Sequence, residues 1–485
     1  MTDTTSVDIP LSGLTDTGER DEFFYLCAIN RATLVINTAQ GLVAPEKARV
    51  YAHAIDEVTR HGVRTDRVIK LEPQLTAIAG PEITELHVGR SSQDMHSTYR
   101  LAMLRDDVLA VHKALSGVID DFTASAEKYR DVVVPNYTNG VAAQPNSLGH
   151  YLLGISDGLI RDRNRLEELY PRANRSSMGS TVLNGTGWPL NRRLMAEKLG
   201  FDGIIENAFD ATQGAPVDLP LEFTQIMQSI ALHTATFIQD VMVQYAQPRP
   251  WMILAEGDDT TYVSSAMPQK RNPGLMNNTR TMASRVASGA VEAALLMHNL
   301  TSGMQDAKNV DSRRAVSDKT QTMLAGLSKI LKSLKVNPDR ALEELNSDWT
   351  ATQEVADELM RRYHVPFRIG HHAASAMVTY ARANNLTPLT FPYSKMAELF
   401  TRETEKEWHK EVFPMSEAEF KAALDPKSIV TARATEGGPQ KASLDQLFAI
   451  RKDSNRKAQA FRSAAQERIL DALTKLETEF ASYLK

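Results

Sequence analysis

Apolar positions recur at helical spacing over long stretches of the chain, and the first such stripe covers residues 101–122. A second stripe of this kind covers residues 223–245 and ends before Pro248 and Pro250, which cannot continue a helix. A third segment, residues 278–297, lacks proline and carries alanines that let backbones approach closely, so we expect it to lie between other helices. In the first stripe the apolar residues alternate steps of three and four, the spacing of helices packed in a bundle: Leu101, Leu104, Val108, Val111, Leu115, Val118 and Phe122.

Shorter helical patterns flank this middle part, two before it and several after it, and the last is an amphipathic helix over residues 443–483. There is no internal repeat. Because wide apolar stripes on long helices must be buried against something, we expect the chain to associate into an oligomer. The pattern predicts three mostly helical blocks, the middle one a bundle of long helices: residues 1–92, 93–345 and 346–485.

The composition excludes several classes of protein. The 485 residues are 42% hydrophobic and 24% charged, which is ordinary for a globular protein and excludes a largely disordered one. A net charge of -5 gives no basic field for nucleic acid or for an anionic membrane. The single cysteine, Cys27, excludes an internal disulfide and metal sites of the multi-cysteine type. With neither a signal-peptide pattern nor a long apolar run, we expect a cytoplasmic protein without membrane spans.

The most informative segment is a polar loop, residues 264–274, which reads Ser-Ser-Ala-Met-Pro-Gln-Lys-Arg-Asn-Pro-Gly and is called the serine loop below. An ordinary connection between helices would explain its prolines and glycine, but not the spacing of its serine, lysine and asparagine. The segment resembles the signature loop of the fumarase/aspartase superfamily, Gly-Ser-Ser-x-Met-Pro-x-Lys-x-Asn-Pro. Val263 replaces the leading glycine of that signature.

This resemblance implies a base and its anion stabilisers. The first serine, Ser264, would remove a proton next to a carboxylate, although the sequence does not separate it from Ser265. Because a serine hydroxyl is a poor acid, its alkoxide needs nearby donors and cations. Lys270 and Asn272 are placed to stabilise it, and also to hold the aci-carboxylate that forms as the Cβ–H bond breaks. Ser265 and Met267 are candidate substrate contacts, and the helix breakers favour a loop that closes over substrate.

Two further segments resemble boxes of argininosuccinate lyases, a branch of this superfamily. Residues 87–94, the first box, are similar to Gly-Arg-Ser-Arg-Asn-Asp, and residues 137–145, the second box, to Gly-Tyr-Thr-His-Leu-Gln-x-Ala-Gln-Pro. The resemblance implies an all-α, three-domain fold and a homotetramer whose central bundle assembles each active site from three subunits. The substrate-binding residues that it implies, with Gln144 and Arg280 as secondary candidates, are Ser91, Ser92, Gln93, Thr138, Asn139, Gln144, Arg280, Gln305 and Lys308.

Three departures separate the chain from argininosuccinate lyases. Ser92 and Gln93 replace an Arg-Asn pair, so a bidentate guanidinium clamp for carboxylate is missing and Arg90 is a candidate to compensate. Asn139 replaces a histidine, and an amide cannot protonate a leaving group near neutral pH. Either the amine leaves with help from water or another residue, or the protein is inactive. Leu300 replaces a tyrosine that contacts the amino-acid half of the substrate.

These departures favour a protein similar to ethylenediamine-disuccinate lyase, a relative of argininosuccinate lyase that splits aminopolycarboxylates into fumarate and a diamine derivative. The leading hypothesis is a carbon–nitrogen lyase that reversibly eliminates a diamine or an amino acid from an N-substituted aspartate and releases fumarate. Argininosuccinate lyase proper and an inactive structural tetramer are the alternatives. We expect no cofactor and no metal, because elimination beside a carboxylate needs only a base and anion stabilisers. The expected partners are the small molecules themselves.

Overall fold

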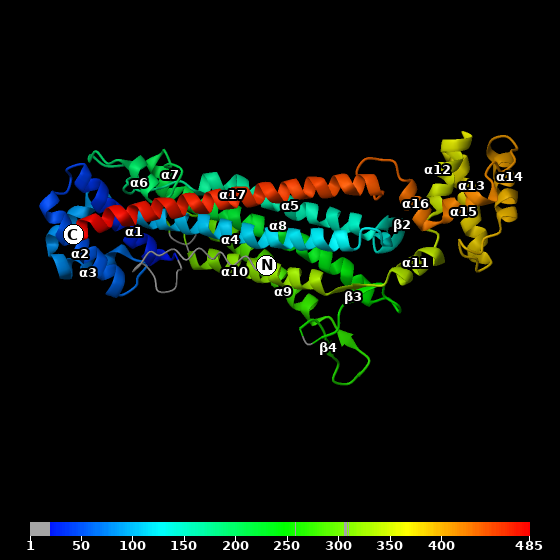
Figure 1. The fold of residues 1–485 in the computed structure, drawn as a ribbon, viewed down its shortest axis with the longest axis horizontal. Coiled ribbons are helices and arrows are strands. Elements are labelled where there is room, and N and C mark those ends of the chain that lie inside the picture. Colours follow the sequence, from blue (N-terminus) through cyan, green and yellow to red (C-terminus); the bar gives the residue numbers. More distant parts are fainter. Residues whose placement is uncertain (1–19, 258, 305–307, 309) are drawn as a thin grey trace.

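The computed structural model describes residues 20–485 except residues 258, 305–307 and 309. Long helices form an elongated bundle, with small helical units at its two ends (Figure 1). The helices are α1 (Glu22–Ala39), α2 (Pro45–His61), α3 (Val68–Ala79), α4 (Ser92–Lys128), α5 (Leu148–Ala173), α6 (Arg192–Lys198), α7 (Ala208–Gln213), α8 (Ala215–Tyr245), α9 (Gly274–Met297), α10 (Val310–Ser333), α11 (Pro338–Ser347), α12 (Thr352–Tyr363), α13 (Phe367–Ala383), α14 (Tyr393–Glu407), α15 (Glu417–Leu424), α16 (Pro426–Ala432) and α17 (Lys441–Ala481), with short 3-10 turns η1 (Pro81–His87) and η3 (Ser482–Leu484).

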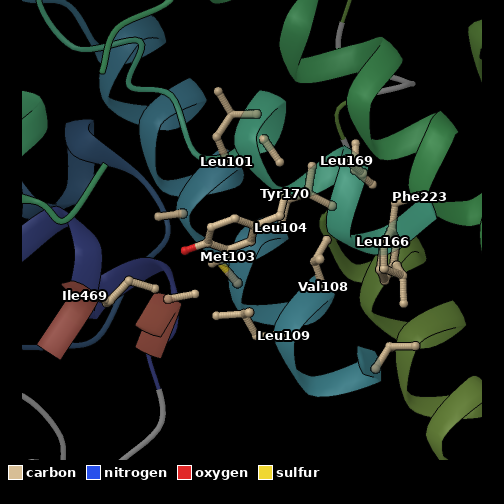
Figure 2. Close-up of a cluster of buried hydrophobic side chains, with 14 of the residues drawn as sticks. Leu101, Met103, Leu104, Val108, Leu109, Leu166, Leu169, Tyr170, Phe223 and Ile469 are labelled. Carbon is tan, nitrogen blue, oxygen red and sulfur yellow. The ribbon is translucent and has the colours of Figure 1, made fainter. Parts of the chain in front are cut away.

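The predicted stripe of residues 101–122 forms the buried side of α4, and this prediction is confirmed. Helix α4 packs against α5 and α10, and α8 packs against α5 and α9. Figure 2 shows how Leu104 and Val108 of α4 gather with Leu166 of α5 and Phe223 of α8. At 1.5 Å per residue the 37 residues of α4 extend over about 55 Å, so this one helix sets the length of the bundle.

The last helix returns along the bundle. Side chains of α17 such as Ile469 and Phe480 belong to the same core as α4, whereas residues 351–429 pack around a second core of their own. A boundary at residue 345 would therefore assign α17 to the C-terminal block although its apolar side chains pack on the central bundle. The division into three domains stays a prediction.

Helix α9 is less enclosed than its alanines predict. Its inner side packs on α8 and α10, but Val291 and Leu295 on its outer side are 50% and 67% exposed. The prediction that it lies between other helices thus holds for one side only within a single chain. None of the described helices is long and apolar enough to cross a membrane.

The prediction of an all-α protein is confirmed, since the described strands are short and form only two-stranded pairs. They are β1 (Val133–Thr138) with β2 (Val141–Ser147), β3 (Met252–Leu254) with β6 (Leu334–Val336), and β4 (Tyr262–Val263) with β5 (Arg271–Asn272). The β1–β2 hairpin was not predicted. Asn139 and Gly140 connect its strands with φ values of 53° and 76°, the left-handed conformation that a tight two-residue turn requires.

Candidate active site

The serine loop lies at the tip of a small ribbon that projects from the side of the bundle (Figure 1). Strands β4 and β5 pair Tyr262 with Asn272 and so hold the two ends of the loop together. Inside it, the Ser264 backbone N–H donates to the Lys270 carbonyl at 3.2 Å and the Lys270 N–H donates to the Met267 carbonyl at 3.0 Å. The predicted base and one of its predicted stabilisers are therefore held in one tight turn.

The hydroxyl of Ser264 faces two backbone donors. Its Oγ accepts from the N–H groups of Met267 at 3.2 Å and of Ala266 at 3.4 Å. Donors aimed at an oxygen stabilise negative charge on it and so favour its ionised form. Ser265 is exposed and makes no side-chain hydrogen bond to the described residues. The geometry therefore distinguishes the two serines, which the sequence did not.

The remaining side chains of the serine loop are open to solvent in one chain. Lys270 and Met267 are exposed, and Asn272 is half-buried with its Nδ2 donating weakly to the Tyr262 carbonyl at 3.4 Å. Arg280, on the following helix α9, is also exposed. A base that works in a dry pocket needs a cover that the described part of a single chain does not supply.

The first box ends at the start of α4. Ser91 is the N-cap residue: its Oγ accepts from the Gln93 N–H at 3.0 Å and donates to the Thr181 carbonyl at 3.3 Å. Its hydroxyl is thus occupied within the chain, which limits it as a ligand for substrate. Ser92 and Gln93 lie in the half-buried first turn, where the positive end of the helix attracts an anion.

A buried carboxylate fixes this helix start. Asp94 is 0% exposed and accepts backbone N–H groups from Ser91 at 2.8 Å, Gly179 at 2.9 Å and Thr181 at 3.2 Å. Burial raises the pKa of Asp94 to about 7, although these hydrogen bonds and the charge of Arg90 act in the opposite direction. Asp94 therefore ties the first box to the loop of residues 179–181.

Arg90 does not replace the missing guanidinium clamp, and that prediction is wrong. Its side chain is buried and donates to Asn30 Oδ1 at 2.8 Å and to Thr33 Oγ1 at 3.1 Å, both on α1. Burial lowers the pKa of Arg90 to about 10. Because α1 accepts from both terminal nitrogens of the head group, Arg90 links the first box to α1.

Lys308 lies at the same end of the bundle as the first box. It is 4% exposed, and its Nζ donates to the Thr212 carbonyl at 2.9 Å and to Gln213 Oε1 at 3.4 Å. Thr212 in turn donates its hydroxyl to the Val182 carbonyl, next to the residue that Ser91 contacts. The structure thus brings Lys308 and the first box together. Gln305 lies outside the described residues.

The second box is the β1–β2 hairpin, and it lies beyond the other end of α4. Thr138 and Asn139 are exposed at its turn, and Gln144 donates from Nε2 to Gln353 Oε1 on α12 at 2.7 Å. The left-handed φ of Asn139 gives a local reason for asparagine here, since asparagine tolerates this conformation better than most residues. A cavity of about 350 Å³ lies under the turn and is lined in part by Asn139.

Sequence reasoning missed the anchor of this hairpin. The hydroxyl of Tyr137 accepts from Trp251 Nε1 at 3.0 Å and from Gln244 Nε2 at 3.1 Å, and donates to Glu344. Burial and Glu344 raise the pKa of Tyr137 to about 12. No local signal marks these partners, because they come from segments more than a hundred residues away.

The candidate residues that the structure describes do not come together in one site within a chain. The segment that leads into the serine loop lies beside the C-terminal half of α4. Asp259 of this segment pairs with Lys329 at 3.0 Å, and the neighbouring Ser328 donates to Asp121 of α4. From Asp121 back to Ser91 the helix extends about 45 Å. Even when fully extended, the chain from Asp259 to Ser264 spans at most ~17 Å. The serine loop therefore cannot reach the first box of its own chain.

Comparisons with known proteins identify relatives of the whole chain. The sequence profile of the lyase family matches residues 39–288, and that of the argininosuccinate lyase C-terminal family matches residues 348–431. A probable argininosuccinate lyase of Schizosaccharomyces pombe is 30% identical over 384 residues, which cover 78% of this chain and 78% of the relative. An argininosuccinate lyase of Methanothermobacter thermautotrophicus is 26% identical over 82% of this chain and 86% of its own.

Solved structures show the same fold. A variant of EDDS lyase with bound fumarate superposes with a TM-score of 0.87 at 23% identity, covering 96% of this chain and 92% of the other. A fumarate lyase from Mesorhizobium gives a TM-score of 0.67 at 17% identity, covering 88% of this chain and 95% of the other. The architecture of the bundle is therefore shared well beyond the sequence relatives.

Proposed function

The chain belongs to the lyase family, in its argininosuccinate lyase branch, and from this premise we propose that it eliminates an amine from an N-substituted aspartate and releases fumarate, with Ser264 as the base. Its relatives named argininosuccinate lyase and the fold shared with a fumarate-bound EDDS lyase support a carbon–nitrogen lyase that forms fumarate. The observation that carries the choice of base is the pair of backbone N–H groups on Ser264 Oγ.

The reaction needs a base for a weakly acidic C–H bond. The Ser264 alkoxide takes the Cβ proton, and the electron pair of that bond moves into the adjacent carboxylate as an aci-carboxylate. Lys270 and Asn272 stabilise this doubly charged group. The pair then returns to form the carbon–carbon double bond while the C–N bond breaks and the amine takes a proton. Because Asn139 cannot give that proton, it comes from water or from another residue.

Separation of the boxes along α4 supports a site shared between copies of the chain. We place the serine loop of one copy beside the first box and Lys308 of another, with the hairpin turn of a third completing the pocket. Ser92 and Gln93 would then hold the succinyl carboxylates together with Thr138. Lys308, with Gln305, would hold the amine half. We propose that the copies form a homotetramer of long bundles, which is a symmetric assembly.

The leading candidate for the amine is a diamine or an amino acid, as in an EDDS-type lyase. Argininosuccinate lyase proper is the second candidate, because the sequence relatives carry that name. Ser92 stands where argininosuccinate lyases have arginine, and Leu300 stands where they have tyrosine. Both replacements argue against argininosuccinate as the substrate. Turnover of argininosuccinate by the purified protein separates the two candidates.

The decisive experiment follows the ultraviolet absorbance of fumarate in mixtures with diamines and amino acids. We expect wild type to consume fumarate with at least one amine. Ser264→Ala should lose about 10²- to 10⁴-fold in kcat, the usual contribution of a general base. Ser265→Ala, the matched control, should lose less than about tenfold. Equal activity of wild type and Ser264→Ala contradicts the proposed base, and absence of turnover with every amine and with argininosuccinate favours the inactive tetramer.

A further inference from the structure

Arg100 continues the polar side of α4 that begins in the first box. Gln93, His96 and Arg100 are spaced by three and then four residues, so they lie on one face of the helix over its first two turns. Arg100 is half-buried, and its Cζ lies 5.7 Å from the centre of the Tyr99 ring. A guanidinium is thus present two turns along the helix from the position where the first box lacks one.

The head group of Arg100 is short of partners. Its Nε and Nη1 are buried and make no hydrogen bond to any residue that the structure describes. The neighbouring Arg313 also has two buried nitrogens, Nε and Nη2, without a hydrogen bond to the described residues. Unlike Arg100, it has an ion-pair partner, Asp107 at 2.9 Å, and it donates to the Arg100 carbonyl at 3.0 Å. Leaving the donors of a charged group buried and unmatched costs free energy. Arg100 combines two such donors with the lack of an ion-pair partner among the described residues, so an anion would complete its surroundings.

A second cation lies close by. Burial and then the charge of Arg100 lower the pKa of Lys308, and burial and then Arg100 lower the pKa of His96 to about 4. The Lys308 ammonium has three N–H donors, and Thr212 and Gln213 accept two of them. Two cations with unused donors, beside a half-buried helix start, are complementary to an anion.

We propose that Arg100 and Lys308 together bind a carboxylate on the amine half of the substrate, so that this protein prefers amines that carry a carboxylate. The inference rests on the proposed function and names the amine class for that site. Arg100 is a binding residue for specificity in this view, and it supplies a guanidinium that the first box itself does not contain.

A matched pair of amines tests this inference. 1,2-Diaminoethane and 2,3-diaminopropionate offer the same two amino groups without and with a carboxylate. With fumarate as the second substrate, we expect the kcat/KM of wild type to be about 10- to 100-fold higher for 2,3-diaminopropionate, the range of a charged hydrogen bond. Arg100→Gln should bring the ratio of the two kcat/KM values close to one, mainly through the KM for the carboxylated amine, and Arg100→Lys should restore part of the preference.

Lys113→Gln is the control, since it removes an exposed cation from the same helix and should keep the wild-type ratio. A second measurement needs no variant: propionate should compete with 1,2-diaminoethane in wild type. An unchanged ratio in Arg100→Gln, equal kcat/KM for both amines in wild type, or lack of competition by propionate overturns the inference. No turnover of either amine by wild type overturns this inference, whereas the proposed function is contradicted only when argininosuccinate and the other amines also fail to react.

Discussion

The distance between Ser264 and Lys308 within one chain predicts that two inactive variants restore each other. Ser264→Ala removes the proposed base, and Lys308→Met removes a buried cation at the other end of the bundle. Each variant alone should lose most of its activity, because each of its active sites carries the same defect. If the serine loop and Lys308 of one site come from different copies, an oligomer that contains both variants has some intact sites.

The size of the recovery follows from counting. In a random mixture of the two variants, half of the serine loops carry Ser264 and half of the copies carry Lys308. A site that takes these two parts from different copies is intact in about a quarter of cases, so activity should rise to about a quarter of wild type. A site built from one copy would show no recovery, since every copy carries one of the two defects.

The assay uses co-expressed chains with two different affinity tags, purified over both, and fumarate absorbance as the readout. The matched control mixes Ser264→Ala with Lys270→Met. Both residues lie in the serine loop of one copy, so no mixed site regains an intact loop and activity should stay at the level of the single variants. Absence of recovery in the mixture of Ser264→Ala and Lys308→Met refutes the shared site. Recovery in the control contradicts the contribution of Ser264 and Lys270 by the same loop.

Two further predictions concern stability. Burial raises the pKa of Asp94 from 3.8 to about 7, so the folded protein holds this proton more tightly than the unfolded chain. The free energy of unfolding of wild type relative to Asp94→Asn should therefore fall by up to ~4 kcal/mol as the pH rises from about 4 to about 7. Urea denaturation measures this difference, and a difference that does not change with pH contradicts the prediction. A Cβ on Gly149 would lie 2.6 Å from Arg130 Cα, whereas nothing lies within 4 Å of a Cβ on Gly154 of the same helix. Gly149→Ala should therefore lower stability by ~1–3 kcal/mol, and Gly154→Ala should raise it by ~0.5–1 kcal/mol. Thermal unfolding that ranks the two variants in the opposite order contradicts the packing of α5 on α4.

Side-chain periodicity was sufficient to predict the long helices. The stripe from Leu101 to Phe122 is buried along α4, because one apolar face of a helix has few alternatives to packing on its neighbours. The hairpin of the second box could have been predicted as well, since Asn139-Gly140 between extended segments is a strong turn signal.

The candidate site was less predictable, because its geometry depends on contacts between distant segments. The sequence placed Arg90 and Ser91 together in one box, but burial turns Arg90 towards α1 and capping occupies the hydroxyl of Ser91. Arg100 carries no motif, and its unmatched donors become visible only when the helix is packed. Spacing along the chain identifies which residues are present, whereas burial decides which of them keep a free donor.

The shape of the bundle restricts how copies can share a site. The serine loop lies near the C-terminal half of α4 and the first box at its N-terminus, so two parallel bundles would bring like ends together and leave both parts unmatched. Two antiparallel bundles, related by a twofold axis across their length, would place the serine loop of one beside the first box of the other. The exposed Val291 and Leu295 lie on α9, the helix that begins at the last residue of the serine loop. Burying this apolar side against a second copy would position the loop at the same time, which joins assembly to the formation of the active site.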